Sequence, residues 1–179
     1  MSAPPSFDIS PAVTEHYESI YRFAYSLAGN PADASDITQQ TFLALARYGH
    51  TIREADKLRG WLFTTAHREF LRQRRKVRAH PTLSLDELEE EPMATETASP
   101  TQVDAAHVMK LVGGLDESLR APLALFYLKN MKYREIAEIL SLPIGTVMSR
   151  LARAKATLRT QLGLDASALP AKPTLPAAV

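Results

Sequence analysis

The stretch YREIAEILSLPIGTVMSRLARAKA, residues 133–156, decides the fold. Apolar residues recur at helical spacing on both sides of residues 141–143, where a proline resists continuation of a helix. We therefore expect two helices joined by a short turn, the second beginning near Gly145 or Thr146, which is the layout of a helix-turn-helix. A plain helical hairpin with solvated arginines is the alternative. The small Ala137, the short turn and a one-sided basic face favour the helix-turn-helix.

The second of these helices has an apolar face and a polar face. Val147, Leu151 and Ala154 share one side and should be buried. The opposite side carries hydroxyl and cationic groups, which donate hydrogen bonds to phosphates and base edges. We expect this side to bind DNA through Thr146, Met148, Ser149, Arg150, Arg153 and Lys155.

Composition excludes several classes of protein. The chain has 179 residues, 45% hydrophobic and 23% charged, as expected for one ordinary or two small globular domains. Zero cysteines exclude disulfides and thiolate metal sites, and the five histidines have no metal-ligand spacing. Since there is also no Gly-rich phosphate loop and no nucleophile–base pair, we expect no cofactor, no metal and no catalytic residue. No apolar run could span a bilayer and no signal peptide is evident, so we expect a cytoplasmic protein without membrane insertion.

Charge is unevenly distributed although the net charge is only +1. Residues 61–80 hold six basic residues and one acid, and residues 79–104 hold seven acids and no Lys or Arg. Residues 120–160 hold eight basic residues and two acids. Two basic blocks separated by an acidic one indicate two anion-binding surfaces on separate bodies.

Helical periodicity also dominates the N-terminal part, where strand signals are nearly absent. We expect a helix at about residues 13–28, then one at 31–47 capped by Asn30, and a third beginning near Leu58. Trp61 in the third helix is a core residue by its spacing, although capture of a DNA base is the alternative. The sequence thus predicts an all-α chain.

The chain divides at its acidic block. We expect two small helical domains joined by a flexible acidic linker, with a disordered Ala/Pro-rich tail at the end. The expected boundaries are 1–79 and 105–163 for the two domains, 80–104 for the linker and 164–179 for the tail.

Three segments carry a resemblance to a known family. Residues 115–159 resemble region 4 of the extracytoplasmic-function (ECF) sigma factors of the sigma-70 family, with EIA, P-x-G-T-V and S-R-L-x-R-A at the family's spacings. DASDITQQTFLALAR, residues 33–47, resembles region 2.2. LRGWLFTTAHREFLRQRRK, residues 58–76, resembles regions 2.3 and 2.4.

This resemblance implies an alternative sigma factor that directs core RNA polymerase to specific promoters. Region 2.2 would bind the polymerase, regions 2.3 and 2.4 would read and melt the −10 element, and region 4 would read the −35 element. An anti-sigma factor is the implied regulator. The implied polymerase-binding residues are Asp33, Asp36, Gln39, Gln40, Leu43 and Arg47. The implied −10 contacts are His50, Arg53, Lys57, Arg68, Arg72, Arg75 and Lys76.

The chain departs from the family at three of these positions. Met148 stands where the family often has Lys or Arg, so one cationic contact is missing. Arg68 replaces a common asparagine, and Arg72 replaces an acidic or amide residue. Arginine can stack on a base or hold a phosphate, so single-strand binding is retained while the family's base preference does not transfer.

A stand-alone helix-turn-helix regulator is the alternative function. In that case the N-terminal domain would sense a ligand or dimerise instead of binding polymerase. The two functions are distinguished by whether the N-terminal domain binds polymerase or a second copy of itself.

Overall fold

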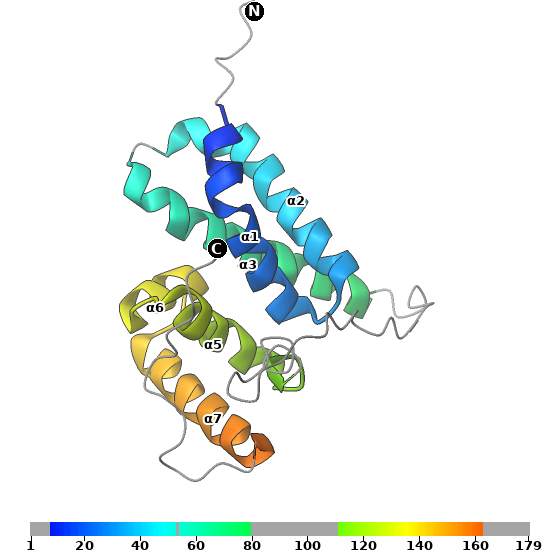
Figure 1. Ribbon diagram of the computed structural model, residues 1–179, viewed down its shortest axis with the longest axis vertical. Helices are drawn as coiled ribbons and strands as arrows, with labels where there is room; N and C mark the ends of the chain where they lie inside the picture. Colours follow the sequence, from blue (N-terminus) through cyan, green and yellow to red (C-terminus); the bar gives the residue numbers. More distant parts are fainter. Residues whose placement is uncertain (1–7, 53, 80–110, 163–179) are drawn as a thin grey trace, which may run out of the picture.

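The computed structural model describes residues 8–52, 54–79 and 111–162, and all of its regular elements are helical. The N-terminal bundle consists of α1 (Ser10–Ala28), α2 (Pro31–Tyr48), the 3-10 helix η1 (Gly49–Thr51) and α3 (Ala55–Ala79). The C-terminal unit contains α5 (Glu117–Lys129), α6 (Tyr133–Leu140) and α7 (Ile144–Leu162) (Figure 1). The predicted all-α fold with two helical domains is confirmed. The predicted linker at 80–104 and tail at 164–179 lie outside the described residues.

The boundary between α1 and α2 follows from two capping groups. Gly29 has φ 79°, a left-handed conformation that glycine adopts without strain, and its N–H donates to the Tyr25 carbonyl at 2.8 Å. The Asn30 Oδ1 accepts the Asp33 N–H at 2.9 Å, which satisfies a free donor of the first turn of α2. The predicted cap at Asn30 is confirmed.

Two predicted helix starts were slightly late. The helix α1 begins at Ser10 instead of near residue 13, and α3 begins at Ala55 instead of near Leu58. Both helices begin with exposed residues, Ser10 and Pro11 in α1 and residues 55–57 in α3, and exposed residues carry little of the apolar periodicity on which the prediction was based.

The core of the N-terminal bundle is built from all three helices. Phe23 of α1 meets Phe63 of α3 edge to face, with ring centres 5.2 Å apart. Trp61 is half-buried and packs against this core, as its spacing predicted. The large side chains with almost no exposure here are Ile20, Phe23, Leu27, Ile37, Leu45, Leu62 and Phe63.

The helix-turn-helix has a tight turn after α6. Ser141 adopts φ 53°, and the Leu142 N–H donates to the Ala137 carbonyl at 2.9 Å. The Pro143 carbonyl then accepts the N–H groups of Thr146 and Val147 at 2.9 and 3.2 Å, which starts α7 at Ile144. Val147, Leu151 and Ala154, which the sequence predicted to be buried, are buried in the structure. On α6, Ile136 and Leu140 are buried as well, whereas Ala137 is only half-buried against the core.

The helix α5 is buried on nearly every side. Leu119 and all residues from 121 to 126 are buried, so no stripe of this helix faces solvent over that length. It packs against α6 and α7 within its own unit and against α1 of the N-terminal bundle, while α6 packs against α3 (Figure 1). The two halves are therefore in extensive contact, which the sequence did not indicate.

We expect Asn30→Ala to lower the free energy of unfolding by about 1 kcal/mol, because an N–H at the start of α2 loses its acceptor. Asn30→Ser keeps an acceptor oxygen and should lose much less stability. Urea denaturation followed by helical circular dichroism measures both. Equal losses in the two variants would show that the cap contributes nothing specific.

Candidate nucleic-acid interface

The helix α7 presents part of the predicted DNA-binding set to solvent. Met148, Ser149 and Arg153 are exposed, while Thr146 is half-buried at the start of the helix. The Ser149 hydroxyl donates to the Thr146 carbonyl at 3.0 Å. Ser149 and Arg153 are one turn apart and share a face, so this face offers a hydroxyl group and a guanidinium group together.

Two other members of the predicted set turn away from that face. The Lys155 ammonium lies 4.7 Å from the centre of the Phe126 ring and 5.6 Å from that of Tyr127. Burial, and secondarily the charge of Arg159, lowers the pKa of Lys155. Arg150 is half-buried and lines a cavity beside α3. The structure thus groups Ser149 and Arg153 outward, and Arg150 and Lys155 inward.

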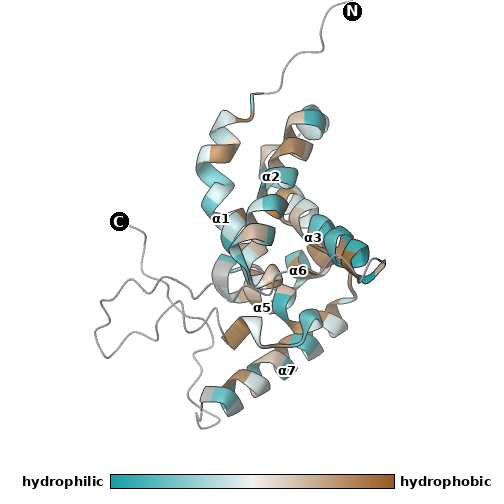
Figure 2. Cartoon of the chain, turned by 90° about the vertical axis from the view of Figure 1, so that its right-hand side faces the viewer, coloured by the Kyte–Doolittle hydropathy of each residue, from teal (hydrophilic) through white to brown (hydrophobic). Residues whose placement is uncertain are grey.

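The helix α3 carries a row of exposed cations. Arg68, Arg72, Arg75 and Lys76 are exposed and fall close to one face of the helix (Figure 2, where the outer turns of α3 are teal). Arg72 Nε donates to Glu69 Oε2 at 2.7 Å, which fixes its direction along the helix surface. This face can hold a phosphate backbone along several turns of helix.

The remaining predicted −10 contacts lie at the other end of α3. His50 is exposed in η1, and Lys57 is exposed and donates to Glu54 Oε1 at 2.6 Å. Arg53 lies outside the described residues. His50 and Lys57 are thus separated along α3 from the four cations near its end.

The predicted polymerase-binding stripe lies on the outer surface of α2. Leu43 is 49% exposed, a large apolar side chain among polar neighbours. Asp36 accepts a hydrogen bond from Gln73 of α3, and Gln40 is half-buried. The members that are exposed are Asp33, Asp36, Gln39, Leu43 and Arg47.

Polar contacts between the two halves were not predicted. Arg120 of α5 donates to the Leu27 carbonyl at 3.0 Å, and the Lys129 ammonium donates to Ser19 Oγ at 2.7 Å. Arg59 of α3 donates to the Lys129 carbonyl at 2.5 Å. The signal that could have revealed this contact is the apolar run at residues 121–126, since a helix apolar on all sides needs partners on two sides.

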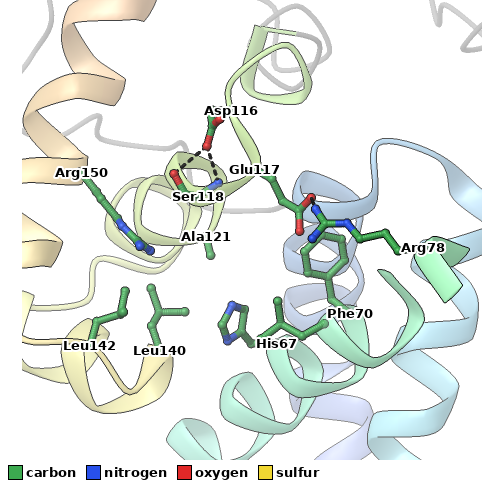
Figure 3. Close-up of a pocket in the computed structure, with 11 residues that line it drawn as sticks. His67, Phe70, Arg78, Asp116, Glu117, Ser118, Ala121, Leu140, Leu142 and Arg150 are labelled. Carbon is green, nitrogen blue, oxygen red and sulfur yellow. Dashed lines mark hydrogen bonds and ion pairs between the residues drawn. The ribbon is translucent and has the colours of Figure 1, made fainter. Parts of the chain in front are cut away.

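A cavity of about 430 Å³ lies where α3 meets the C-terminal unit (Figure 3). Leu140 and Leu142 line one side, His67 and Phe70 of α3 another, and Arg150 reaches in from α7. Burial lowers the pKa of His67 to about 4, with smaller contributions from the charges of Arg150 and Arg68. His67 is therefore neutral at pH 7.

Metal and membrane chemistry are not indicated in the described ranges. No three His, Asp or Glu side chains gather there in a way that could hold a metal ion. None of the helices described has both the length and the apolar character needed to cross a bilayer.

Family models match both halves of the chain in order. Residues 12–80 match the model "Sigma-70 region 2". Residues 107–158 match the model "Sigma-70, region 4". These matches span the N-terminal bundle and the helix-turn-helix, and leave most of the acidic block between them.

Two curated relatives align with most of the chain. The ECF RNA polymerase sigma factor SigE of Mycolicibacterium smegmatis is 30% identical over 173 residues, which cover 93% of this chain and 65% of SigE. The ECF RNA polymerase sigma factor SigL of Mycobacterium tuberculosis is 31% identical over 153 residues, which cover 83% of this chain and 85% of SigL. The chain therefore spans just under two thirds of the length of SigE.

Two solved structures have a similar fold. The sigma factor RpoE in complex with the anti-sigma factor NepR, from Bartonella quintana, matches with a TM-score of 0.73 and 25% identity. That match covers 88% of this chain and 98% of RpoE. CnrH in complex with the cytosolic domain of CnrY matches with a TM-score of 0.60 at 24% identity, over 87% of each chain.

We expect acid to destabilise the folded chain through His67. Its pKa is about 4 in the folded state against 6.5 for the free side chain, so unfolding takes up a proton as the pH falls from about 6.5 to 4. This contribution to stability is complete above about pH 7 and should fall by about 1–2 kcal/mol by pH 5. Urea denaturation at both pH values, in the wild type and in His67→Gln, measures it. An identical pH dependence in the two proteins would contradict the assignment.

Proposed function

Because this chain belongs to the extracytoplasmic-function sigma factors of the sigma-70 family, we propose that it binds core RNA polymerase and directs it to specific promoters. The polymerase supplies the catalysis, and this chain supplies promoter recognition in the cytoplasm. The observation that carries the proposal is the helix-turn-helix, whose apolar residues are buried while Ser149 and Arg153 face solvent. An anionic duplex is the ligand that this polar, cationic face suits.

The −35 element would be read by the exposed face of α7. Arg153 is the exposed guanidinium of the predicted set, and an arginine in the major groove can bond guanine O6 and N7 together. Thr146 lies at the start of α7, where helix N–H groups favour a phosphate. We therefore assign readout to Arg153 and positioning to Thr146.

The −10 element would be held by the exposed cations of α3. Arg68, Arg72, Arg75 and Lys76 offer guanidinium planes and charges for an unpaired strand, which supports a role in opening the duplex. The base preference is a property of this chain rather than of the family, since Arg68 and Arg72 depart from the family's residues.

Binding to core polymerase would use the outer surface of α2. Leu43 supplies an apolar centre, and Asp33, Gln39 and Arg47 supply polar and charged groups around it. An apolar centre with a polar rim is the layout of a protein–protein interface, which supports this surface as the docking site. The similar structure of RpoE from Bartonella quintana is a complex with the anti-sigma factor NepR, which supports an anti-sigma factor as the regulator of this chain too.

Contact with both promoter elements requires the two halves to separate. The −10 and −35 elements lie about 25 base pairs apart, or about 85 Å along the duplex. A compact chain of this length has a radius of gyration of about 16 Å, so the closed arrangement is too small to reach both. A chain of 31 residues, the number between the described halves, has a maximum covalent reach of about 100 Å, which is sufficient.

We expect Arg153→Ala to weaken promoter binding by the holoenzyme by about 1–3 kcal/mol and to relax discrimination at the −35 element, because a base contact is lost. The measurement is binding to a cognate −35 duplex and to a scrambled one at fixed salt. Arg134→Ala, which removes an exposed cation of α6, is the matched control and should weaken both duplexes alike. Unchanged affinities for both duplexes in Arg153→Ala would mean that α7 does not enter the groove in this orientation.

We expect Leu43→Asp to reduce affinity for core polymerase at least tenfold, because a charge replaces the apolar centre of the docking surface. The fold should survive, since the side chain is already half exposed. Thr14→Asp places the same charge on an exposed site of α1 and serves as the control. Fluorescence titration with core polymerase measures both, and equal affinities would exclude the outer surface of α2 as the docking site.

A further inference from the structure

Two arginines near the end of α3 contact one carboxylate oxygen of the C-terminal unit. The distances to Glu117 Oε2 are 3.2 Å from Arg74 Nη2 and 3.4 Å from Arg78 Nη2. Arg74 Nε also donates to this oxygen at 3.2 Å. Figure 3 shows the Glu117 carboxylate directed at the Arg78 guanidinium. One oxygen therefore accepts three N–H donors from two guanidinium groups.

The five arginines at residues 68–78 of α3 fall on two adjoining faces. Arg68, Arg72 and Arg75 lie at i, i+4 and i+7 and are exposed, as the proposed DNA-binding face. Arg74 and Arg78 lie at i and i+4 on the neighbouring face, directed at the C-terminal unit. Because successive helix residues are about 100° apart, the second face borders the first. A ligand along the first face would pass close to both arginines.

We propose that Arg74 and Arg78 form a second binding site for a DNA backbone phosphate, which the Glu117 carboxylate fills while the two halves are closed. This inference rests on the proposed function, in which α3 contacts promoter DNA. Glu117 and a phosphate compete for the same guanidinium groups. DNA bound along α3 and closure of the two halves are therefore mutually exclusive at this site.

The chemistry of the contact suits an exchange of carboxylate for phosphate. Guanidinium groups bind carboxylate and phosphate oxygens with the same N–H geometry. Residues 74–78 hold four cations, Arg74, Arg75, Lys76 and Arg78, whose mutual repulsion an anion relieves. Within the described part of the chain, Glu117 is the acid in ion-pair range of both Arg74 and Arg78.

The Glu117 contact is weak enough to be displaced. The side chains of Arg74 and Arg78 are 49% and 73% exposed, and that of Glu117 is 27% exposed. Ion pairs this exposed change an equilibrium by about two- to fivefold. A DNA strand brings several phosphates and releases counterions, so its attraction to the α3 cations exceeds that of one carboxylate.

The other polar contacts between the halves do not compete with DNA in this way. Arg59 and Arg120 donate to backbone carbonyls, and Lys129 donates to a serine hydroxyl. Among the described polar contacts between the halves, only that of Glu117 places an anion on cations of α3. DNA should therefore oppose closure of the two halves chiefly by displacing Glu117. Because the coupling between two equilibria is reciprocal, closure should weaken DNA binding to α3.

The test measures closure and DNA binding separately on the full chain. Because the sequence has no cysteine, Ala32→Cys on α2 and Ala156→Cys on α7, both exposed, allow specific attachment of a donor and an acceptor dye. Energy transfer without DNA then reports the separation of the halves. Fluorescence anisotropy with a labelled mixed-sequence duplex, at fixed low salt, reports DNA binding by unlabelled protein.

Glu117→Gln should increase the separation and tighten duplex binding by about two- to fivefold. Glu138→Gln, which removes the same charge from an exposed site on α6, is the control for net charge and should not change the separation. Arg74→Gln/Arg78→Gln should also increase the separation, yet weaken duplex binding and reduce its salt dependence by about two phosphate contacts. Adding Glu117→Gln to this double variant should change neither quantity further.

Three results would overturn the proposal. In the first, Glu117→Gln leaves the separation of the halves unchanged. In the second, Glu117→Gln raises the duplex affinity no more than Glu138→Gln does. In the third, Arg74→Gln/Arg78→Gln binds the duplex as tightly as the wild type. Binding to core polymerase, measured on the same variants, separates this proposal from the proposed function. A wild-type chain that does not bind polymerase refutes the function. If the wild type binds polymerase but Glu117→Gln changes neither the separation nor the duplex affinity, only the phosphate site is refuted.

Discussion

The burial of α5 is the constraint on which the arrangement of the chain depends. Residues 121–126 are buried without interruption, and no helix can hide all of its sides against a single neighbour. The helices α6 and α7 cover one side and complete the helix-turn-helix, while the N-terminal bundle covers the other. The same helix therefore both supports the DNA-binding motif and draws the two halves together. This explains why two units joined by a long segment are found packed against each other.

The contact between the halves contains more polar and charged groups than a protein core does. The two halves can therefore separate. Lys129 is buried enough that its pKa falls to about 8, chiefly through desolvation and then through the charges of Arg22 and Arg59. It is still protonated at pH 7, so closure buries a cation at a cost that its hydrogen bond to the Ser19 hydroxyl only partly offsets. His67 avoids that cost by staying neutral. Interfaces of this composition resemble transient contacts between domains more than a permanent core.

Local sequence signals predicted the elements well, and the long-range packing poorly. Asn30, Gly29 and Pro143 act through bonds to residues a few positions away, so capping and turn rules locate them. The outward position of Arg153 followed from helical periodicity for the same reason. Arg150 and Lys155 were grouped with it because they are cationic, but the cavity beside His67 and the ring of Phe126 hold them inward. Those partners are distant from Arg150 and Lys155 in the sequence, and no local sequence pattern identifies them. The apolar run at residues 121–126 of α5 is the one available sign, and it does not identify which elements cover the helix.

Separation of the halves exposes apolar surface to water and also breaks the ion pairs of Glu117. Different binding partners are needed to compensate these two costs. An anionic duplex can replace Glu117 on the α3 arginines, but it cannot cover Ala121 and Ala124 of α5, which are buried in the closed arrangement. Exposing such a surface to water opposes separation in proportion to the apolar area uncovered. DNA alone should therefore shift the equilibrium only slightly. A protein partner that covers apolar surface on α5, while Leu43 docks on it elsewhere, would hold the halves apart far more effectively. Strong promoter binding should accordingly depend on core polymerase, because only a protein surface meets both requirements.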